Sequence, residues 1–593
     1  MKKSHSFHIP VMGIGYTIDT PLKVAQYGMD SVISLVDDIL LEKLRKMYSE
    51  KFEVPFKEIS EKAEDFRAKR ITSYLNLIND LSKDKFEALK NVSEETSTEI
   101  KNYISLLPDY STLKKEYEKL TSTSFNYSEI KKWAKKNLTM GSIDVNIMTK
   151  VDKDNYIKKK KLPVEYNDAH AALRGYANSD LESSVILSAG MNPRLYAYIG
   201  KFDDFYPNEE GIIKKKIILK VSDYRSALIQ GKFLAKKGLW VSEYRIESGL
   251  NCGGHAFATD GYLLGPVLAE FKDKRNELHA SIQDLLNQVL ETQGRVVSKT
   301  PLSLEITAQG GVGTEEEHEF LMSQYNLDSV GWGSPFLLVP EATTVDNRTL
   351  EKLAAAKEED LYLSDISPLG VPFNNLRDNT KDAEKEALIT KGRPGSVCPK
   401  RFVALNKEFS EEGICTASRQ YQRLKLKALD QANLSAKEHK NQYTKIVEKT
   451  CTCVGLGTSS LLAYDLETKV EGKGVSICPG PNMAYYSKVM SLKEITDHIY
   501  GRDNVMSRTD RPNMFIKELH IYTDYLKNKL EEAKITMTKK QEKYLITFTS
   551  NMKEGVAYYQ NLFQGMKHNF EDAKSKVLKE LELSNNILQN ISL

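Results

Sequence analysis

Long apolar runs and a marked charge bias are both missing from this chain of 593 residues. No window approaches the roughly 18 consecutive apolar residues of a membrane-spanning helix, and the N-terminal "MKKSHSFHIPVMGIG" lacks the apolar core of a secretory signal peptide. The 84 basic and 81 acidic side chains leave a formal net charge of +3, which gives no sign of a nucleic-acid or membrane partner. We therefore expect a cytoplasmic protein without a membrane partner, for which a nucleic acid is a disfavoured ligand.

Cysteine is also scarce, with six in the whole chain. So few cysteines exclude a disulfide scaffold and leave free thiols, a metal or a cluster as the alternatives. Hydrophobic residues make up 40% and charged residues 28%, which is ordinary for a globular protein. The length predicts two or three domains with a large core.

Short apolar runs alternate with helical patterns along the first 345 residues, as in "SDYRSALIQGKFLAKK" and "TEEEHEFLMSQY", which each follow such a run. This alternation is typical of parallel strands joined by crossover helices. Eight runs predict an α/β fold, a (β/α)8 TIM barrel, with a doubly wound sheet as the alternative because its local pattern is the same. The runs are "IPVMGIGY", "DSVISLVDD", "SIDVNIMTK", "SSVILSAG", "KKKIILKVS", "GLWVSEYR", "LSLEITAQGG" and "LDSVGWGS".

The alternation is interrupted once and ends well before the last residue. Residues 39–140 are charged and helical in pattern, which predicts a helical insertion after the second strand that serves either as packing on the barrel rim or as a lid or docking surface. The barrel is then expected over residues 1–38 and 141–380. Residues 381–509 form a loop-rich, cysteine-bearing module, and residues 510–593 read as amphipathic helices. These helices are expected to cover the module or to form a homo-oligomer contact.

One segment after the sixth run, "ESGLNCGGHAF", combines residues suited to catalysis. Ligand-binding and catalytic residues of a TIM barrel lie in the loops that follow its strands, so Cys252, Gly253, Gly254 and His255 are expected over the barrel mouth. The glycines allow a sharp turn and a close approach to a flat ligand. The imidazole of His255, which titrates near neutral pH, is predicted to face that ligand, with a purely structural histidine as the alternative.

Two glycine clusters follow the seventh and eighth runs. "ITAQGGVGT" places Gly310 and Gly311 before a helix start, and "VGWGSPF" contains Gly331, Gly333 and Ser334. Uncovered backbone amides near a helix N-terminus bind phosphate, and the loops after these two strands are the recurrent phosphate site of the fold. Together they predict a phosphate-bearing ligand.

In order and content these motifs resemble the nitronate monooxygenase family, formerly called 2-nitropropane dioxygenases. "NCGGH" resembles the family's "EAGGH", "AQGGVGT" its "AGGI", "VGWGSPFLLVPEA" its "GT.F....E", and "VNIM" its "VNL". The likeness covers residues 9–38 and about 140–380. Members are FMN-dependent TIM barrels related to flavin-dependent enoyl-acyl carrier protein reductases and trans-acting enoyl reductases.

The resemblance implies FMN as the cofactor, NAD(P)H as a candidate electron donor, and His255 as the catalytic histidine. Asn146 and Lys220 would reach the polar edge of the flavin ring, and the glycine clusters would hold its phosphate. The residues implied to bind the cofactor are Met12, Gly13, Ile14, Asn146, Lys220, Gly253, Gly254, Gly310, Gly311, Gly331, Gly333 and Ser334.

Two departures from the family pattern matter. Asn251 and Cys252 replace the family's glutamate and alanine before the glycines, so Cys252 is expected either as a nucleophile beside the flavin or as a small packing residue. The insertion and the C-terminal third are foreign to small family members. Substrate identity is therefore not carried over.

Five cysteines fall within the loop-rich module. Two precede proline, and scattered thiolates on an irregular backbone suit iron–sulfur ligation, although the spacing matches neither common ferredoxin runs nor zinc ribbons. A [4Fe-4S] cluster, a zinc ion and metal-free buried thiols are the three alternatives. The candidate ligands are Cys398, Cys415, Cys451, Cys453 and Cys478.

These observations predict an FMN-dependent oxidoreductase with His255 as acid or base, acting on a small-molecule or acyl-thioester substrate. An NAD(P)H-dependent enoyl-thioester reductase is the closest alternative among enzymes. A non-catalytic ligand-binding or scaffold protein is the alternative from another class.

Overall fold

In the described part of the chain, eight parallel strands close into a barrel, in the order β1, β2, β3, β6, β7, β8, β9 and β10 around the ring. Seven of the eight predicted apolar runs contain most or all of one strand, whereas the first run, residues 9–16, shares only Ile9 with its strand and otherwise lies in the loop that follows. The closed ring of eight strands confirms the (β/α)8 TIM barrel and excludes a doubly wound sheet. The strands are β1 (Phe7–Ile9), β2 (Asp30–Ser34), β3 (Ile143–Ile147), β6 (Ser184–Leu187), β7 (Lys216–Val221), β8 (Val241–Glu247), β9 (Glu305–Gln309) and β10 (Ser329–Gly331).

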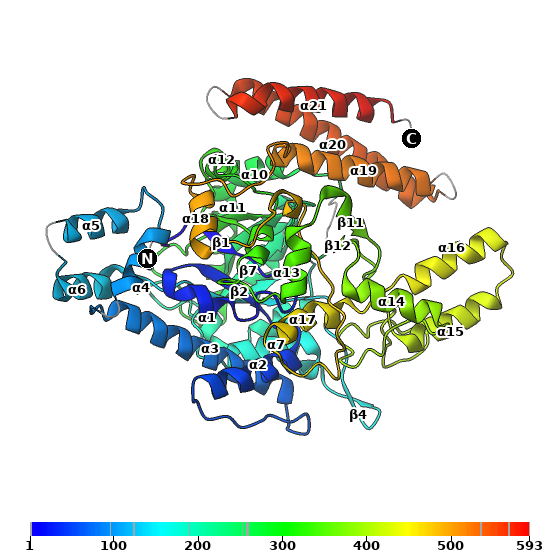
Figure 1. Cartoon of the computed structure of the whole chain (residues 1–593), viewed down its shortest axis with the longest axis horizontal. Helices are drawn as coiled ribbons and strands as arrows, with labels where there is room; N and C mark the ends of the chain where they lie inside the picture. Colours follow the sequence, from blue (N-terminus) through cyan, green and yellow to red (C-terminus); the bar gives the residue numbers. More distant parts are fainter. Residues whose placement is uncertain are drawn as a thin grey trace.

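The structure is a computed structural model, shown in Figure 1. It describes residues 3–94, 97–122, 125–188, 190–251, 253–255, 260–533, 537–566 and 570–591. No helix within these ranges combines the length and apolar composition that a membrane span requires.

Helices follow the strands and surround the barrel. Their starts are set locally: Asn192, Asp223 and Thr314 each place a side-chain oxygen on a backbone amide of the first helical turn, as N-caps do. The surrounding helices are α1 (Thr20–Val24), α7 (Asp168–Ala177), α8 (Pro193–Ile199), α9 (Tyr224–Ala235), α10 (Leu264–Asp273), α11 (Arg275–Thr292), α12 (Glu315–Tyr325) and α13 (Asn347–Ala354). Two short hairpins, β4 (Tyr156–Ile157) with β5 (Lys160–Lys161) and β11 (Leu361–Ser364) with β12 (Phe373–Leu376), lie outside the barrel sheet.

The segment between β2 and β3 is helical, and part of it has a hydrophobic core of its own around Ile100, Tyr103 and Ile130. The Tyr103 hydroxyl lies 2.8 Å from Ser4 Oγ and donates to the Thr139 carbonyl, both near the N-terminal ends of strands. This part therefore packs on the end of the barrel opposite to the strand C-termini, which favours rim packing over a lid. The helices are α2 (Asp38–Lys51), α3 (Phe66–Lys90), α4 (Ser97–Leu106), α5 (Thr112–Thr121) and α6 (Tyr127–Asn137).

The cysteine-bearing region packs over the other end of the barrel. Its helix α17 (Thr452–Ala463) is buried over most of its length and lies against the loop after β1, where Gly15 N donates to Leu456 O at 3.1 Å and Ser460 Oγ to Gly15 O at 2.8 Å. Side chains of this region and of the barrel belong to the same hydrophobic core. The other helices here are α14 (Thr380–Thr390), α15 (Arg419–Asp430), α16 (Ala436–Val447) and α18 (Leu492–Ile499).

The C-terminal helices α19 (Met514–Ala533), α20 (Lys539–Gly565) and α21 (Glu571–Gln589) stack at one side of the molecule (Figure 1). They pack on the barrel helices: Glu518 of α19 accepts hydrogen bonds from Leu264 N at 3.0 Å and from the Tyr559 hydroxyl of α20 at 3.1 Å. The first of these bonds caps the N-terminus of α10. The amphipathic helices thus cover the barrel side, and Lys517 of α19 also lies over the ring of Tyr485 in the cysteine-bearing region.

Glu518 makes this contact sensitive to pH. Burial raises the pKa of its carboxyl from 4.5 to about 7, so the folded state binds the proton more tightly than the unfolded state does. Its contribution to stability is fully present below about pH 4.5 and is lost as the pH rises through about 7, and the shift corresponds to about 3 kcal/mol. We expect Glu518→Gln, which keeps an oxygen acceptor but no charge, to raise the melting temperature relative to wild type at pH 8 but not at pH 4.5.

The measurement is the melting temperature by intrinsic fluorescence at both pH values. Glu532→Gln, an exposed position on the same helix, is the matched control and should give no pH-dependent difference. A Glu518→Gln variant less stable than wild type at pH 8 would contradict the assignment.

Candidate active site

A cavity of about 420 Å³ opens at the C-terminal ends of the barrel strands. One wall comes from the barrel, including Asn146, Lys220 and His255, and the opposite wall comes from the cysteine-bearing region, including Val403 and Leu456. A mostly apolar cavity with a few converging polar groups is the usual form of a small-molecule site. Its position is where TIM-barrel enzymes carry their active sites.

The floor of the cavity is built by the two-residue alternation of the strands. Val32, Ile186 and Ile218 form a small apolar cluster, and two residues further along each strand a polar side chain lines the cavity, because residues i and i+2 face the same side of a strand. The polar residues at these strand ends are Ser34, Asn146, Ser188, Lys220, Glu247 and Gln309. Sequence reasoning found Asn146 and Lys220 but missed the other four, which the same alternation could have identified.

Lys220 and Asn146 differ in their hydrogen bonding. Lys220 Nζ donates to Glu247 Oε1 at 3.1 Å, and Gln309 Nε2 donates to the same oxygen, so the ammonium group is held in place. The side-chain oxygen of Asn146 is buried and has no hydrogen-bond partner among the described residues. An unpartnered buried acceptor costs free energy, and it is therefore a candidate for binding a donor on a ligand.

The GGH loop, residues 253–255, is held by the β11–β12 hairpin. Asn374 N donates to Gly254 O at 2.8 Å, and His255 forms a bridge with Phe373, whose ring centroid lies 5.2 Å from the imidazole centroid. Gly253 has a φ of +126°, and a Cβ there would lie 2.0 Å from the Cys478 carbonyl oxygen. Glycine is required at this position both by conformation and by the close approach of the second chain segment.

His255 faces the cavity as a neutral imidazole. Its Nε2 lies 2.7 Å from Ser367 Oγ, and burial together with the positive charge of Lys220 lowers its pKa from 6.5 to about 4. The uncharged form therefore dominates at neutral pH. The protein thus holds the ring through Nε2, and no hydrogen bond joins Nδ1 to a residue in the described ranges.

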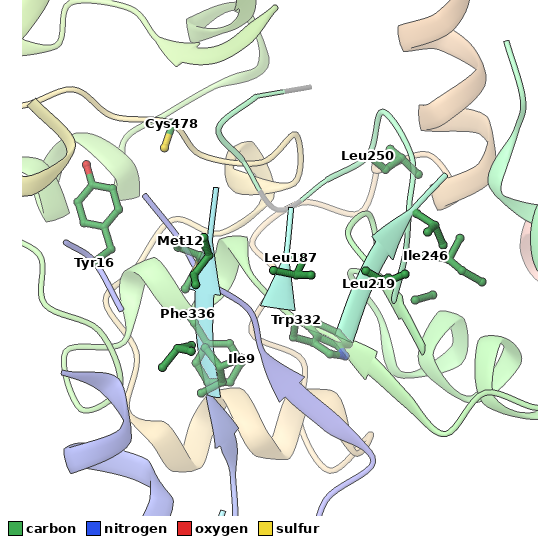
Figure 2. Close-up of a cluster of buried hydrophobic side chains, with 14 of the residues drawn as sticks. Ile9, Met12, Tyr16, Leu187, Leu219, Ile246, Leu250, Trp332, Phe336 and Cys478 are labelled. Atoms are coloured by element: carbon green, nitrogen blue, oxygen red, sulfur yellow. The ribbon is translucent and has the colours of Figure 1, made fainter. Parts of the chain in front are cut away.

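The remaining predicted residues of this loop and of the segment after the first strand differ in their position relative to the cavity. Cys252 lies outside the described residues. Gly13 and Ile14 line the cavity, whereas Met12 belongs to the buried hydrophobic cluster of Figure 2, together with Ile9 and Phe336.

The glycine loop after β9 is filled by protein groups. Gly313 N, at the start of α12, donates to the Glu317 carboxylate at 2.9 Å, and Arg511 pairs with both oxygens of that carboxylate at 2.8 and 2.9 Å. Arg511 and Asn482 also donate to the Gly311 carbonyl. A carboxylate of the chain itself thus accepts from the Gly313 amide, in the same loop as the two glycines predicted to bind a phosphate.

The residues predicted to bind a phosphate lie outside the cavity lining. None of them is among the described residues that line the cavity; Gly310 and Gly311 pack against Leu250 and Asn251, and Gly331 against Gln309 and His8. The phosphate site stays a prediction. The residues concerned are Gly310, Gly311, Gly331, Gly333 and Ser334.

The five candidate metal ligands are all buried. Cys398, Cys415, Cys451 and Cys453 lie together, whereas the Cys478 thiol faces the backbone amides of Gly13 and Gly254, with a pKa that burial raises to about 12. Cys453 and Cys478 both line the cavity. In the described parts of the chain, no three histidine, cysteine, aspartate or glutamate side chains are arranged to hold a single metal ion.

The fold and the cavity thus define a TIM-barrel protein with a site at the strand C-termini. No family model and no curated protein matches the sequence. Solved structures with a likeness include the enoyl reductase domain of MlnA from the macrolactin biosynthesis cluster of Bacillus amyloliquefaciens, at 16% identity over 63% of this chain and 83% of that chain, with a TM-score of 0.33. Nitroalkane oxidase from Streptomyces ansochromogenes is another, at 8% identity over 84% of this chain and 94% of that chain, also with a TM-score of 0.33. At this identity and TM-score neither likeness indicates a function for this chain.

The low pKa of His255 gives a direct prediction. Diethyl pyrocarbonate acylates only the neutral imidazole, so the pH midpoint of His255 modification should lie near 4 in the wild type. Lys220→Met removes a positive charge and leaves Glu247 unpaired, and both changes should move the midpoint upward. Peptide mass spectrometry after labelling across a pH series measures it, with Lys150→Met, another lysine of the cavity, as the control. A wild-type midpoint at the ordinary histidine value would contradict the assigned environment.

Proposed function

We propose that this chain is a flavin-dependent oxidoreductase of the nitronate monooxygenase and enoyl reductase type, with FMN in the cavity at the barrel mouth. The observation that carries the proposal is the convergence of three groups on that cavity: the unpartnered oxygen of Asn146, the ammonium group of Lys220 and the neutral imidazole of His255. The GGH motif that the resemblance singled out supplies the third of them.

The cavity suits the ring of a flavin. The polar edge of an isoalloxazine carries one N–H donor between carbonyl acceptors, which calls for an acceptor and a cation side by side. Asn146 offers the acceptor and Lys220 the cation, while Gly13 and Ile14 line the cavity after β1. The loop predicted to bind the phosphate does not fit that group in the same way, because Glu317 and Arg511 fill it.

The residues of the chain have separable tasks in this proposal. A bound flavin would supply the two-electron redox chemistry. His255, neutral above about pH 5, accepts a proton from an acidic substrate carbon at Nδ1, or holds one there for delivery, while Ser367 fixes the ring through Nε2. Val403, Leu405 and Leu456 give the opposite wall an apolar surface, which excludes water from the reacting atoms.

The acid–base role predicts the effect of His255→Asn. We expect kcat/KM to fall about 100- to 1000-fold, as losses of general acid–base catalysis do, with flavin content unchanged. Two assays separate the candidate reactions: oxygen uptake with an alkyl nitronate, and NAD(P)H oxidation with a crotonyl thioester. His439→Asn, at a salt-bridged surface position on α16, is the control. Full activity in His255→Asn would contradict the mechanism, and a wild type that turns over neither substrate class would favour the non-catalytic alternative.

Because Glu317 and Arg511 fill the glycine loop after β9, we expect the flavin ring, and not its phosphate, to provide most of the binding energy. If binding energy comes from the ring, removal of the phosphate should change affinity little, so FMN and riboflavin should bind the flavin-free protein with Kd values within about tenfold, or about 1.4 kcal/mol. Flavin fluorescence quenching measures both constants. An FMN preference above about 100-fold would show that Glu317 and Arg511 yield the loop to the phosphate.

A further inference from the structure

Two asparagine side chains that lie 123 positions apart in the sequence hold the backbone of the GGH loop. Asn374 Nδ2 donates to Asn251 Oδ1 at 3.0 Å, and Asn251 Nδ2 donates in turn to the carbonyl oxygen of His255. The Gly253 amide also donates to Asn251 Oδ1, at 3.4 Å. The two side-chain amides therefore form a chain of hydrogen bonds that begins on β12 and ends on the backbone of His255.

This amide pair fits in one orientation only. Asn251 presents its oxygen to two donors and its NH2 group to a carbonyl, so a rotation of this amide by 180° would break all three contacts. Asn251 is only 8% exposed, and a buried amide without partners costs free energy. The orientation of the Asn251 amide is thus fixed, and the donor on Asn374 is one of the groups that fix it.

The segment that carries Asn374 also holds the imidazole ring. Ser367 Oγ lies 2.7 Å from His255 Nε2, and the ring of Phe373 packs against the imidazole at an interplanar angle of 68°. Ser364 Oγ donates to the Phe373 carbonyl at 2.8 Å, which joins β11 to β12. Residues 364–374 therefore contact the backbone, the ring and one ring nitrogen of His255.

The loop itself has little intrinsic stiffness. Gly253 and Gly254 have φ values of +126° and +76°, and nothing lies within 4 Å of the place that a Cβ at Gly254 would occupy. Consecutive glycines have the widest choice of backbone conformations, so packing at Gly254 does not select the observed one. The hydrogen bonds from Asn251 and from the backbone of Asn374 supply that selection.

We propose that Asn374 is a positioning residue for His255 and acts through Asn251. Asn374 is not among the described residues that line the cavity, and its side chain reaches His255 by way of the Asn251 amide. The inference rests on the proposed function, in which the imidazole must face the reacting atoms. A misplacement of about 1 Å can cost about 100-fold in rate, so the amide pair governs kcat without contacting the substrate.

The test combines Asn374→Ala with His255→Asn in the flavin-loaded full chain, assayed with the substrate class that the wild type turns over. Asn374→Ala keeps the backbone bond to Gly254 O and removes only the side-chain donor. We expect kcat to fall about 10- to 100-fold, with KM and flavin content unchanged. In the His255→Asn background the same substitution should have no further effect, because the imidazole that it positions is absent. Asn433→Ala, at an exposed position between α15 and α16, is the matched control.

A second measurement needs no turnover. Loss of the amide pair frees the loop, so the imidazole separates from Ser367 and gains contact with solvent. The rate at which diethyl pyrocarbonate labels His255 at pH 7 should therefore rise severalfold in Asn374→Ala. It should rise equally in Asn251→Ala, which removes the other half of the pair and gives the same comparison if Asn374→Ala does not fold.

The positioning role is overturned by a kcat of Asn374→Ala equal to that of wild type, or by a labelling rate that does not change. It is also overturned by an equal loss of kcat in the wild-type and His255→Asn backgrounds, which is the result that general loosening of the fold would give. A wild type without turnover contradicts the proposed function alone, because the labelling rate still tests the positioning of His255.

Discussion

Closure of eight parallel strands is the constraint on which the rest of this structure depends. Once the ring is closed, every second side chain points inward, and the last inward residue of each strand meets its counterparts at one end. Asn146, Lys220, Glu247 and Gln309 converge in this way although they span more than 160 positions of sequence. Ordinary strand alternation therefore creates a polar floor without any local motif.

The second half of the chain adds a second wall over this open barrel end and so forms the cavity. Two buried charge clusters anchor it: Lys400 joins Asp37 and Glu471, and Arg511 joins Glu317. Removing one partner of a buried ion pair typically costs about 3 to 5 kcal/mol because the other charge stays buried, so both contacts fix the geometry of the cavity. The same anchoring places Cys453 in the cavity wall.

Features encoded by neighbouring residues could be predicted from the sequence, whereas features formed by residues far apart in the sequence could not. Apolar runs with helical spacers gave the number of strands and placed seven of them, with β1 expected a few residues too late, and the GGH segment led to His255. Both patterns lie within a few residues. The filling of the glycine loop was missed, since Arg511 lies 194 residues after Glu317 and nothing in "AQGGVGT" reveals that partner. The grouping of Cys398 and Cys415 with Cys451 and Cys453 likewise depends on tertiary packing, and cysteine spacing alone left Cys478 indistinguishable from them.

The central claim is that the cavity holds a flavin. The most direct measurement is a structure of the chain purified without oxygen and supplied with FMN, at a resolution that shows a bound ring. We predict density for an isoalloxazine between the barrel mouth and α17, with its polar edge against Asn146 and Lys220. A cavity that stays empty at saturating FMN, or a ring bound elsewhere, would contradict it.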